Sequence, residues 1–152
     1  MQSKEEEDVV HSIYVDCKFV LFNALNLIYL QLIQSNDFVP DIRPHSVSTT
    51  LQDVIDLVMW NERSREIWID VKDRTQEGYI LSFDQRSLRV VLFNVISNAL
   101  KFQEKGRIFI KIGVPISAHL MESAQTMLEI TVVDQGIGVL DSEVAQVFDL
   151  FW

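Results

Sequence analysis

The chain has 152 residues and a mass of 17.6 kDa, the size of one domain or of one domain with an appendage. Its 48% hydrophobic and 23% charged residues exclude wholesale disorder. A formal net charge of −9 argues against nucleic-acid binding, which needs clustered positive charge. The single cysteine, Cys17, cannot form an internal disulfide, and no Cys/His cluster suggests zinc. We therefore expect a reducing, cytoplasmic location.

The N-terminal part of the chain does not have the pattern of a secretory or transit signal, because residues 5–8 are all acidic. The most apolar stretch runs from Phe19 to Ile33. It is shorter than the roughly 20 residues that a bilayer span needs. We therefore expect no membrane segment here, and a helix that is buried or packed against a partner.

Residues 5–35 contain no proline or glycine and are predicted to form this first helix. Their apolar residues recur at alternating spacings of four and three, the pattern of a seam between packed helices. The seam consists of Val10, Tyr14, Cys17, Leu21, Ala24 and Ile28, and it is widened by Ile13, Val20 and Leu27. So broad a face predicts a partner, which is a further helix, a second copy of the chain or the rest of this domain.

Residues 36–50 are predicted to be an extended connector, because Pro40 and Pro44 disfavour helix at the residues before them. Thr49 and Gln52 resemble a capping box. They predict the start of a short helix whose apolar face is Leu51, Val54, Ile55 and Val58. Alternating residues from Ile67 to Val71, and then Tyr79 to Phe83, predict two strands.

Asp84 is a good N-cap for a second long helix that ends near Phe102. Strands are predicted at 108–114 and 128–133, and a last short helix from Asp141 to about Leu150. The apolar face of the long helix is predicted to be Leu88, Val91, Leu92, Val95, Ile96, Ala99 and Leu100. Trp60 and Trp68 are expected to pack helix against sheet. This order of elements predicts an α/β (α+β) two-layer sandwich, with helices over one mixed sheet and a long helix before it.

Asn94, Asn98 and Lys101 form one polar line along the second long helix, at i, i+4 and i+7. Asparagine is a poor residue in the middle of a helix, so two on one line are unusual. An ordinary solvated face is one interpretation. The other is a site where amide oxygens meet a hydrated cation and an ammonium group meets phosphates.

A glycine-rich segment, Asp134-Gln135-Gly136-Ile137-Gly138, directly follows a predicted hydrophobic strand. Two glycines separated by one residue allow a tight turn and a close approach of a ligand to the backbone. The carboxylate at the strand end could accept a hydrogen bond from a base amine. A plain turn between strand and helix fits the same pattern, so this segment alone is weak evidence.

Taken together and in order, these segments resemble sensor histidine kinases. Residues 93–102 resemble the N-box of that family, and Glu104 to Gly106 match the residues directly after that box. Residues 134–138 resemble its first glycine box, and Val147 to Phe151 its phenylalanine box. Leu25 to Val58 resemble the second dimerisation helix, the connector and the first helix of the ATP-binding domain. The resemblance implies three regions: 1–36 a remnant of the dimerisation helix, 37–50 a connector, and 51–152 a partial ATP-binding domain.

The resemblance also implies roles for individual residues. Asn98 matches the family's Mg²⁺ ligand, and Asn94 and Lys101 match residues near the nucleotide phosphates. Asp134 matches the carboxylate that reads the adenine amine. The implied nucleotide-binding set is Asn94, Asn98, Lys101, Phe102, Asp134, Gly136 and Gly138. Hydrolytic relatives have a glutamate where this chain has Asn94, and an amide cannot accept a proton at neutral pH. The amide therefore favours transfer of phosphate from ATP to a protein histidine over hydrolysis.

The sequence departs from the family pattern in two places. It stops after the phenylalanine box, so the nucleotide lid and second glycine box have no match in it, and we expect a truncated domain with impaired phosphoryl transfer. No phosphoacceptor is identified either, because His11 is followed by Ser12 rather than by an acid, and neither His45 nor His119 has an identifiable partner. No residue is therefore assigned as catalytic.

The function implied is the ATP-binding region of a two-component sensor kinase, with ATP and Mg²⁺ as cofactors. A homodimer through the first helix and a response regulator or receiver domain are the expected partners. Whether this chain is itself an enzyme stays open. The alternative is a non-catalytic interaction or dimerisation module derived from the same fold, and an ATP-hydrolysing member ranks third.

Overall fold

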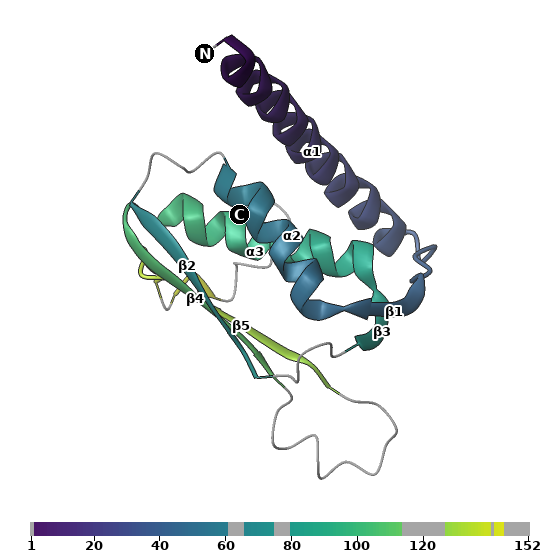
Figure 1. The fold of residues 1–152 in the computed structure, drawn as a ribbon. Helices are drawn as coiled ribbons and strands as arrows, with labels where there is room; N and C mark the ends of the chain where they lie inside the picture. The colour runs from purple at the N-terminus through teal and green to yellow at the C-terminus, as the bar shows by residue number, and fades with distance from the viewer. Residues whose placement is uncertain (1, 61–65, 75–79, 114–126, 141, 145–152) are drawn as a thin grey trace.

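The computed structural model describes residues 2–60, 66–74, 80–113, 127–140 and 142–144. The elements in order are α1 (Gln2–Gln34), β1 (Ile42–Ser46), α2 (Val47–Trp60), β2 (Ile67–Asp73), β3 (Ile80–Asp84), α3 (Gln85–Phe102), β4 (Gly106–Gly113) and β5 (Glu129–Val133). This α+β architecture with a long N-terminal helix confirms the predicted fold class (Figure 1). Of the last helix predicted from Asp141 to about Leu150, the structure describes only 142–144, and the segment 147–151 lies outside the described residues.

The strands form two sheets rather than the single mixed sheet that was predicted. In the larger sheet β4 is central, parallel to β2 and antiparallel to β5. In the smaller sheet β1 pairs antiparallel with β3. Helices α2 and α3 lie over one face of the larger sheet, and α1 lies on the other side of these two helices (Figure 1). Helix α3, which carries the predicted polar line, therefore lies in a middle layer between the larger sheet and α1.

The core lies between β4 and the pair α2–α3. The inward residues of β4 are Ile108, Ile110 and Ile112, all at most 1% exposed, which confirms the predicted alternation along this strand. The apolar face predicted for α2 is also buried, at Leu51, Val54, Ile55 and Val58. Burial of a branched aliphatic side chain contributes about 1.5–3 kcal/mol, so this layer supplies much of the stability.

Two predictions about residues 36–50 are wrong. The segment is not wholly a connector, because β1 forms within it and Pro44 lies in that strand. Proline lacks an N–H group, and it is tolerated here because β1 is paired only on the side of β3. Helix α2 begins at Val47 rather than after Thr49, since the Ser46 hydroxyl accepts the Thr49 N–H at 3.2 Å and acts as the cap.

Helix α1 packs against the domain through a face other than the predicted seam. Val15 is 3% exposed, and the rings of Phe19 and Phe22 lie 5.3 and 4.9 Å from the ring of Phe93 on α3. The predicted seam, by contrast, remains in solvent. Its residues Val10, Tyr14, Leu21 and Ile28 are 52–67% exposed, and the flanking Ile13, Val20 and Leu27 are 57–69% exposed. Among the described residues, the rest of the domain is therefore not the partner of that seam.

Helix α1 is also longer and more apolar than the stretch 19–33 suggested. Its segment Val9–Gln34 spans 26 residues with a mean hydropathy of 1.4. By length and composition alone it is sufficient to cross a membrane, a test that core helices of soluble proteins and signal sequences also pass. The expectation that no membrane segment is present stays a prediction.

The buried face of α3 is rotated relative to the predicted one. Val91 and Val95 are 56% and 44% exposed, whereas Phe93 is 2% exposed because it meets α1. The N-cap Asp84 and the helix end at Phe102 are confirmed. Trp68 does not pack helix against sheet, since it is 57% exposed on β2.

Candidate functional site

The start of α3 is fixed by Asp84, the last residue of β3. One of its carboxylate oxygens accepts the Ser87 N–H at 2.9 Å, and the other accepts the Asp41 N–H at 2.8 Å. Partial burial raises the pKa of Asp84, but these backbone hydrogen bonds outweigh burial and leave the pKa lowered. The helix therefore leaves the small sheet in a defined direction and carries the polar line with it.

The polar line is present as predicted on the solvent side of α3. Asn94, Asn98 and Lys101 are all exposed. The Lys101 ammonium lies 5.1 Å from the centre of the Phe102 ring, a distance that allows a cation–π contact. This stretch of α3 thus presents two amides, an ammonium group and an aromatic ring.

The glycine loop, residues 134–138, continues from the end of β5 and turns back onto the end of α3. The Asp134 carboxylate accepts the Gly136 N–H at 2.9 Å, and the Ile137 N–H donates to the Phe102 carbonyl at 3.3 Å. A Cβ atom at Gly136 would lie 2.5 Å from that carbonyl oxygen, so this position requires glycine. At Gly138 a φ of +71° favours glycine for its backbone conformation instead.

Two glutamines that the sequence analysis did not select tie this loop to its neighbours. Gln103 is 1% exposed, and its side-chain carbonyl accepts the Gln135 N–H at 2.7 Å. The side-chain carbonyl of Gln135 in turn accepts the Arg107 N–H at 3.1 Å. The turn at Gly106, with a φ of +105°, leaves room for this contact, because a Cβ there would lie 2.8 Å from the Gln135 oxygen.

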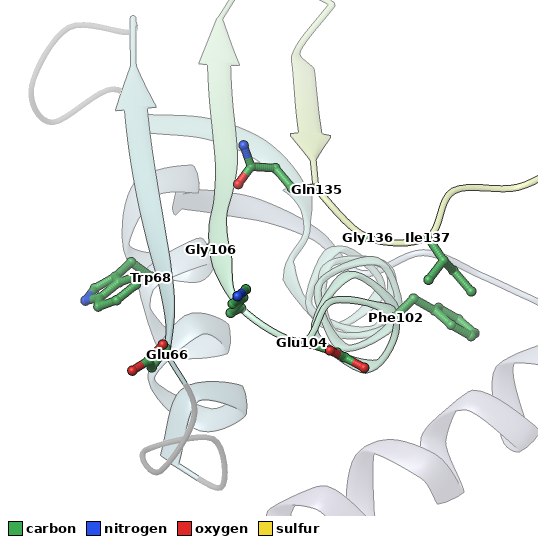
Figure 2. A pocket seen from close by; sticks show the side chains of 9 residues that line it. Glu66, Trp68, Phe102, Glu104, Gly106, Gln135, Gly136 and Ile137 are labelled. Atoms are coloured by element: carbon green, nitrogen blue, oxygen red, sulfur yellow. The ribbon is translucent and has the colours of Figure 1, made fainter.

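A cavity of about 620 Å³ opens where the loop, the end of α3 and the start of β4 meet. Figure 2 shows Phe102 and Ile137 together at the end of α3, whereas Trp68 points away from them on β2. The lining residues are Glu66, Trp68, Phe102, Glu104, Lys105, Gly106, Gln135, Gly136 and Ile137. Of the seven predicted binding residues, Phe102 and Gly136 line this cavity. Asn94, Asn98, Lys101, Asp134 and Gly138 do not.

Asn94 already has a partner in this structure. Its amide nitrogen donates to the Asn26 carbonyl oxygen at 3.1 Å, and the Asn26 amide nitrogen donates to the Asn94 carbonyl oxygen at 2.8 Å. This reciprocal amide pair joins α1 to α3 next to the aromatic contacts of Phe93. The sequence analysis did not predict it, because the two residues are 68 positions apart.

The side chains around the glycine loop are suited to bind a polar ligand that carries a flat ring. Asp134 offers a carboxylate, α3 offers amide oxygens and an ammonium group, and Phe102 and Ile137 offer apolar surface. Within the described residues no group of three His, Cys, Asp or Glu side chains is placed to hold a metal ion. The amide oxygens of α3, together with a bound molecule and water, are the kinds of oxygen ligand that Mg²⁺ accepts.

Comparison with known proteins gives a family match over residues 83–152, to the "Histidine kinase-, DNA gyrase B-, and HSP90-like ATPase" family. Among curated proteins, the chain is 25% identical over 151 residues to Hybrid signal transduction histidine kinase A of Dictyostelium discoideum. It is 38% identical over 89 residues to Autoinducer 2 sensor kinase/phosphatase LuxQ of Vibrio vulnificus, and 24% identical over 152 residues to Circadian input-output histidine kinase CikA of Synechococcus elongatus.

These alignments cover 98%, 59% and 98% of this chain in the same order. The chain spans only 7%, 10% and 19% of the length of those relatives. The likeness therefore does not establish the activity of those whole proteins for this chain.

Solved structures share the fold. The ShkA full-length structure in complex with AMPPNP aligns with a TM-score of 0.62 and 21% identity, over 74% of this chain and 22% of that one. The catalytic domain of histidine kinase ThkA aligns with a TM-score of 0.61 and 18% identity, over 74% of this chain and 70% of that one. At these identities the likeness shows the fold alone.

Proposed function

Because this chain carries an ATPase domain of the sensor histidine kinase type, we propose that it binds ATP where α3 meets the glycine loop. The observation that carries the proposal is the contact of Gly136 with the Phe102 carbonyl. It brings two segments more than 30 residues apart to one place, as the resemblance to the N-box and the first glycine box requires.

Each predicted residue has a role in this proposal. Asp134 accepts a hydrogen bond from the adenine amine, and the Gly136 N–H holds that carboxylate in place. Phe102 supplies apolar surface, while Asn94 and Lys101 contact the phosphates. Gly136 and Gly138 let the loop turn beside the ligand.

Asn98 fits a role in binding Mg²⁺ together with the nucleotide. Its amide is exposed, and a carbonyl oxygen is a suitable ligand for a hard cation that keeps several waters and binds phosphate oxygens. The ion would neutralise charge on the phosphates. The predicted residues on α3 include no carboxylate, so we expect Mg²⁺ to bind there only together with the nucleotide.

In the whole protein the γ-phosphoryl group is proposed to pass to a protein histidine that feeds a response regulator or receiver domain. Asn94 is an amide and cannot act as the base that activates water, so hydrolysis is not the favoured reaction. Phosphoryl transfer depends on positioning and charge stabilisation. The polypeptide of residues 1–152 has no match to the second glycine box, and we expect impaired transfer from it.

The regions proposed are a dimerisation-type helix at 1–36, a partial ATP-binding domain at 51–152, and between them a segment at 37–50 that joins the two and contains β1 and the first turn of α2. Homodimerisation is proposed through the exposed seam of α1, whose residues are too apolar to remain in water. A cytoplasmic location is proposed for the domain, in a parent protein that is soluble or membrane-tethered.

The alternative of a non-catalytic interaction module has one observation in its favour. Both amide atoms of Asn94 are engaged by Asn26, so α1 holds a residue that a nucleotide site would use. A protein that serves only as an interaction module would retain the contact between Asn26 and Asn94 and would not bind nucleotide. Titration with Mg·ATP separates the two functions directly.

Titration calorimetry of Asp134→Asn and Asn98→Ala with Mg·ATP and Mg·GTP tests the proposal. Asp134→Asn should lower the preference for ATP over GTP by about 5- to 150-fold, since a mismatched buried hydrogen bond costs about 1–3 kcal/mol. Asn98→Ala should weaken binding in Mg²⁺ and make little difference in EDTA. Asp37→Asn, which changes an exposed carboxylate of the connector, is the control. Tight binding that survives Asn98→Ala would contradict this assignment.

Labelling with radioactive ATP and Mg²⁺ tests the expected impairment. The 152-residue polypeptide should not become labelled at histidine. Acid-labile phosphate on His11 would contradict this expectation, and His11→Gln identifies the site. Labelling that stays absent when a longer chain of the parent and an acceptor histidine are both supplied would favour the interaction module.

A further inference from the structure

Gln103 is unusual because its polar side chain is buried at the end of a helix, where it meets a different part of the chain. It is 1% exposed, and Thr50 is the other polar residue buried to this degree among the described residues. Its backbone is extended, with φ −117° and ψ 126°, and it follows Phe102, the last residue of α3. Burying an amide is unfavourable unless it forms hydrogen bonds, so a contact of this kind has a structural or functional reason.

The hydrogen bond that Gln103 accepts is made by one particular peptide group. The donor is the N–H of Gln135, which belongs to the peptide that joins Asp134 to Gln135. At 2.7 Å this bond is at the short end of the range for N–H···O contacts. Fixing this peptide plane restricts the backbone of Asp134, from which the carboxylate extends.

A second hydrogen bond restrains the same loop, through the side chain of Gln135. The Gln135 side chain accepts the N–H of Arg107, the second residue of β4. The loop is thus joined to the end of α3 by Gln103 and to the start of β4 by Gln135. The glycine at 106 is what permits the second bond, because a Cβ there would collide with the Gln135 oxygen.

We propose that Gln103 and Gln135 are positioning residues that fix the direction of the Asp134 carboxylate, and thereby the discrimination of adenine from guanine. This inference rests on the proposed function of Asp134. Neither glutamine contacts the base. Gln103 acts through the backbone of the loop, and Gln135 acts by holding that loop against β4.

The test combines amide hydrogen exchange, measured by NMR without nucleotide, with titration of ADP and GDP in Mg²⁺. Gln103→Met keeps the length of the side chain and removes the acceptor. The Gln135 amide should then exchange at least about fivefold faster, and the preference for ADP over GDP should fall about three- to tenfold. Thr50→Val is the control, because it removes hydrogen bonds of another buried side chain, one donated to the Ser46 carbonyl and one accepted from the Gln85 amide, without touching the loop.

Gln135→Ala is a second variant at an exposed residue, so the core is unchanged. It should accelerate exchange of the Arg107 amide while the amide at position 135 stays protected, and it should also lower the preference for ADP. An unchanged preference in both variants, despite faster exchange, would overturn the inference. If the wild-type chain shows slow exchange at Gln135 and no preference for ADP, then the proposed function of Asp134 fails, and this inference fails with it although the loop geometry is upheld.

Discussion

Asp84 shows how one side chain can connect three elements. It ends β3, caps α3 through Ser87, and accepts the N–H of Asp41, which directly precedes β1. The backbone hydrogen bonds favour the charged carboxylate and lower its pKa in spite of partial burial. Because the folded pKa lies below the unfolded value of about 3.9, Asp84 stabilises the fold above that pH.

Replacing this carboxylate should destabilise the protein in a manner that depends on pH. Asp84→Ala should lower the free energy of unfolding by about 1–2 kcal/mol at pH 7, since it removes a helix cap and leaves two N–H groups unpaired. The difference from wild type should shrink as the pH falls below about 4 through the folded pKa. Urea unfolding at several pH values measures this. A difference that stays constant down to pH 2 would contradict the assigned charge.

Single residues differ in how far the sequence predicts them. The cap at Asp84 was predictable because an N-cap is a local pattern, and the turn at Gly136 and Gly138 because two glycines after a strand form a compact motif. Gln103 was not, since its role depends on a donor 32 residues away and a glutamine after a helix end has no local signature. The reciprocal pair of Asn26 and Asn94 escaped prediction for the same reason.

At the scale of elements, the helices and most strands followed from periodicity, whereas their buried faces did not. The α1 seam was inferred from spacing alone, and spacing cannot tell a face that meets the domain from one that meets solvent. Helix α3 has the same ambiguity, because α1 covers Phe93 and leaves Val91 and Val95 open. β1 was missed because Pro44 is unfavourable in a strand paired on both sides.

The contact of α1 with α3 yields a prediction for nucleotide binding. Asn26→Ala removes the partner of Asn94 and frees its amide for phosphate, so affinity for Mg·ATP should rise about two- to tenfold. Asn23→Ala is the matched control, because the Asn23 amide bonds the Phe19 carbonyl within α1. Calorimetry compares the two variants with wild type. Equal or weaker binding by Asn26→Ala would show that the amide pair does not compete with nucleotide.

At the scale of the whole molecule, the exposed seam of α1 is a departure from an ordinary globular surface. Leu27 and Val20 are 69% and 67% exposed and lie among other apolar residues of the same helix. Leu27→Glu should weaken self-association at least tenfold, measured by sedimentation, because a buried charge in a helix interface is costly. Val39→Glu adds the same charge at an exposed apolar residue outside α1 and should leave association unchanged.

A wild-type chain that sediments at 17.6 kDa at high concentration would contradict the homodimer. The same samples can be floated with phospholipid vesicles, because α1 also has the length and composition of a membrane span. Co-flotation that is lost in Leu27→Glu would assign the seam to lipid instead of to a second copy.

Helix α1 contacts α3 on one side and exposes its apolar seam on the other, so a rotation of α1 about its own axis would act on the amide pair. Side-chain ends lie about 5–6 Å from a helix axis, so turning α1 by about 20° displaces them by about 2 Å. The bonds between Asn26 and Asn94 are 2.8 and 3.1 Å long, and hydrogen bonds weaken steeply beyond about 3.2 Å. A small rotation of α1, driven by a partner on its exposed seam, would therefore break both hydrogen bonds at once. It would release Asn94 from Asn26 without unfolding either helix.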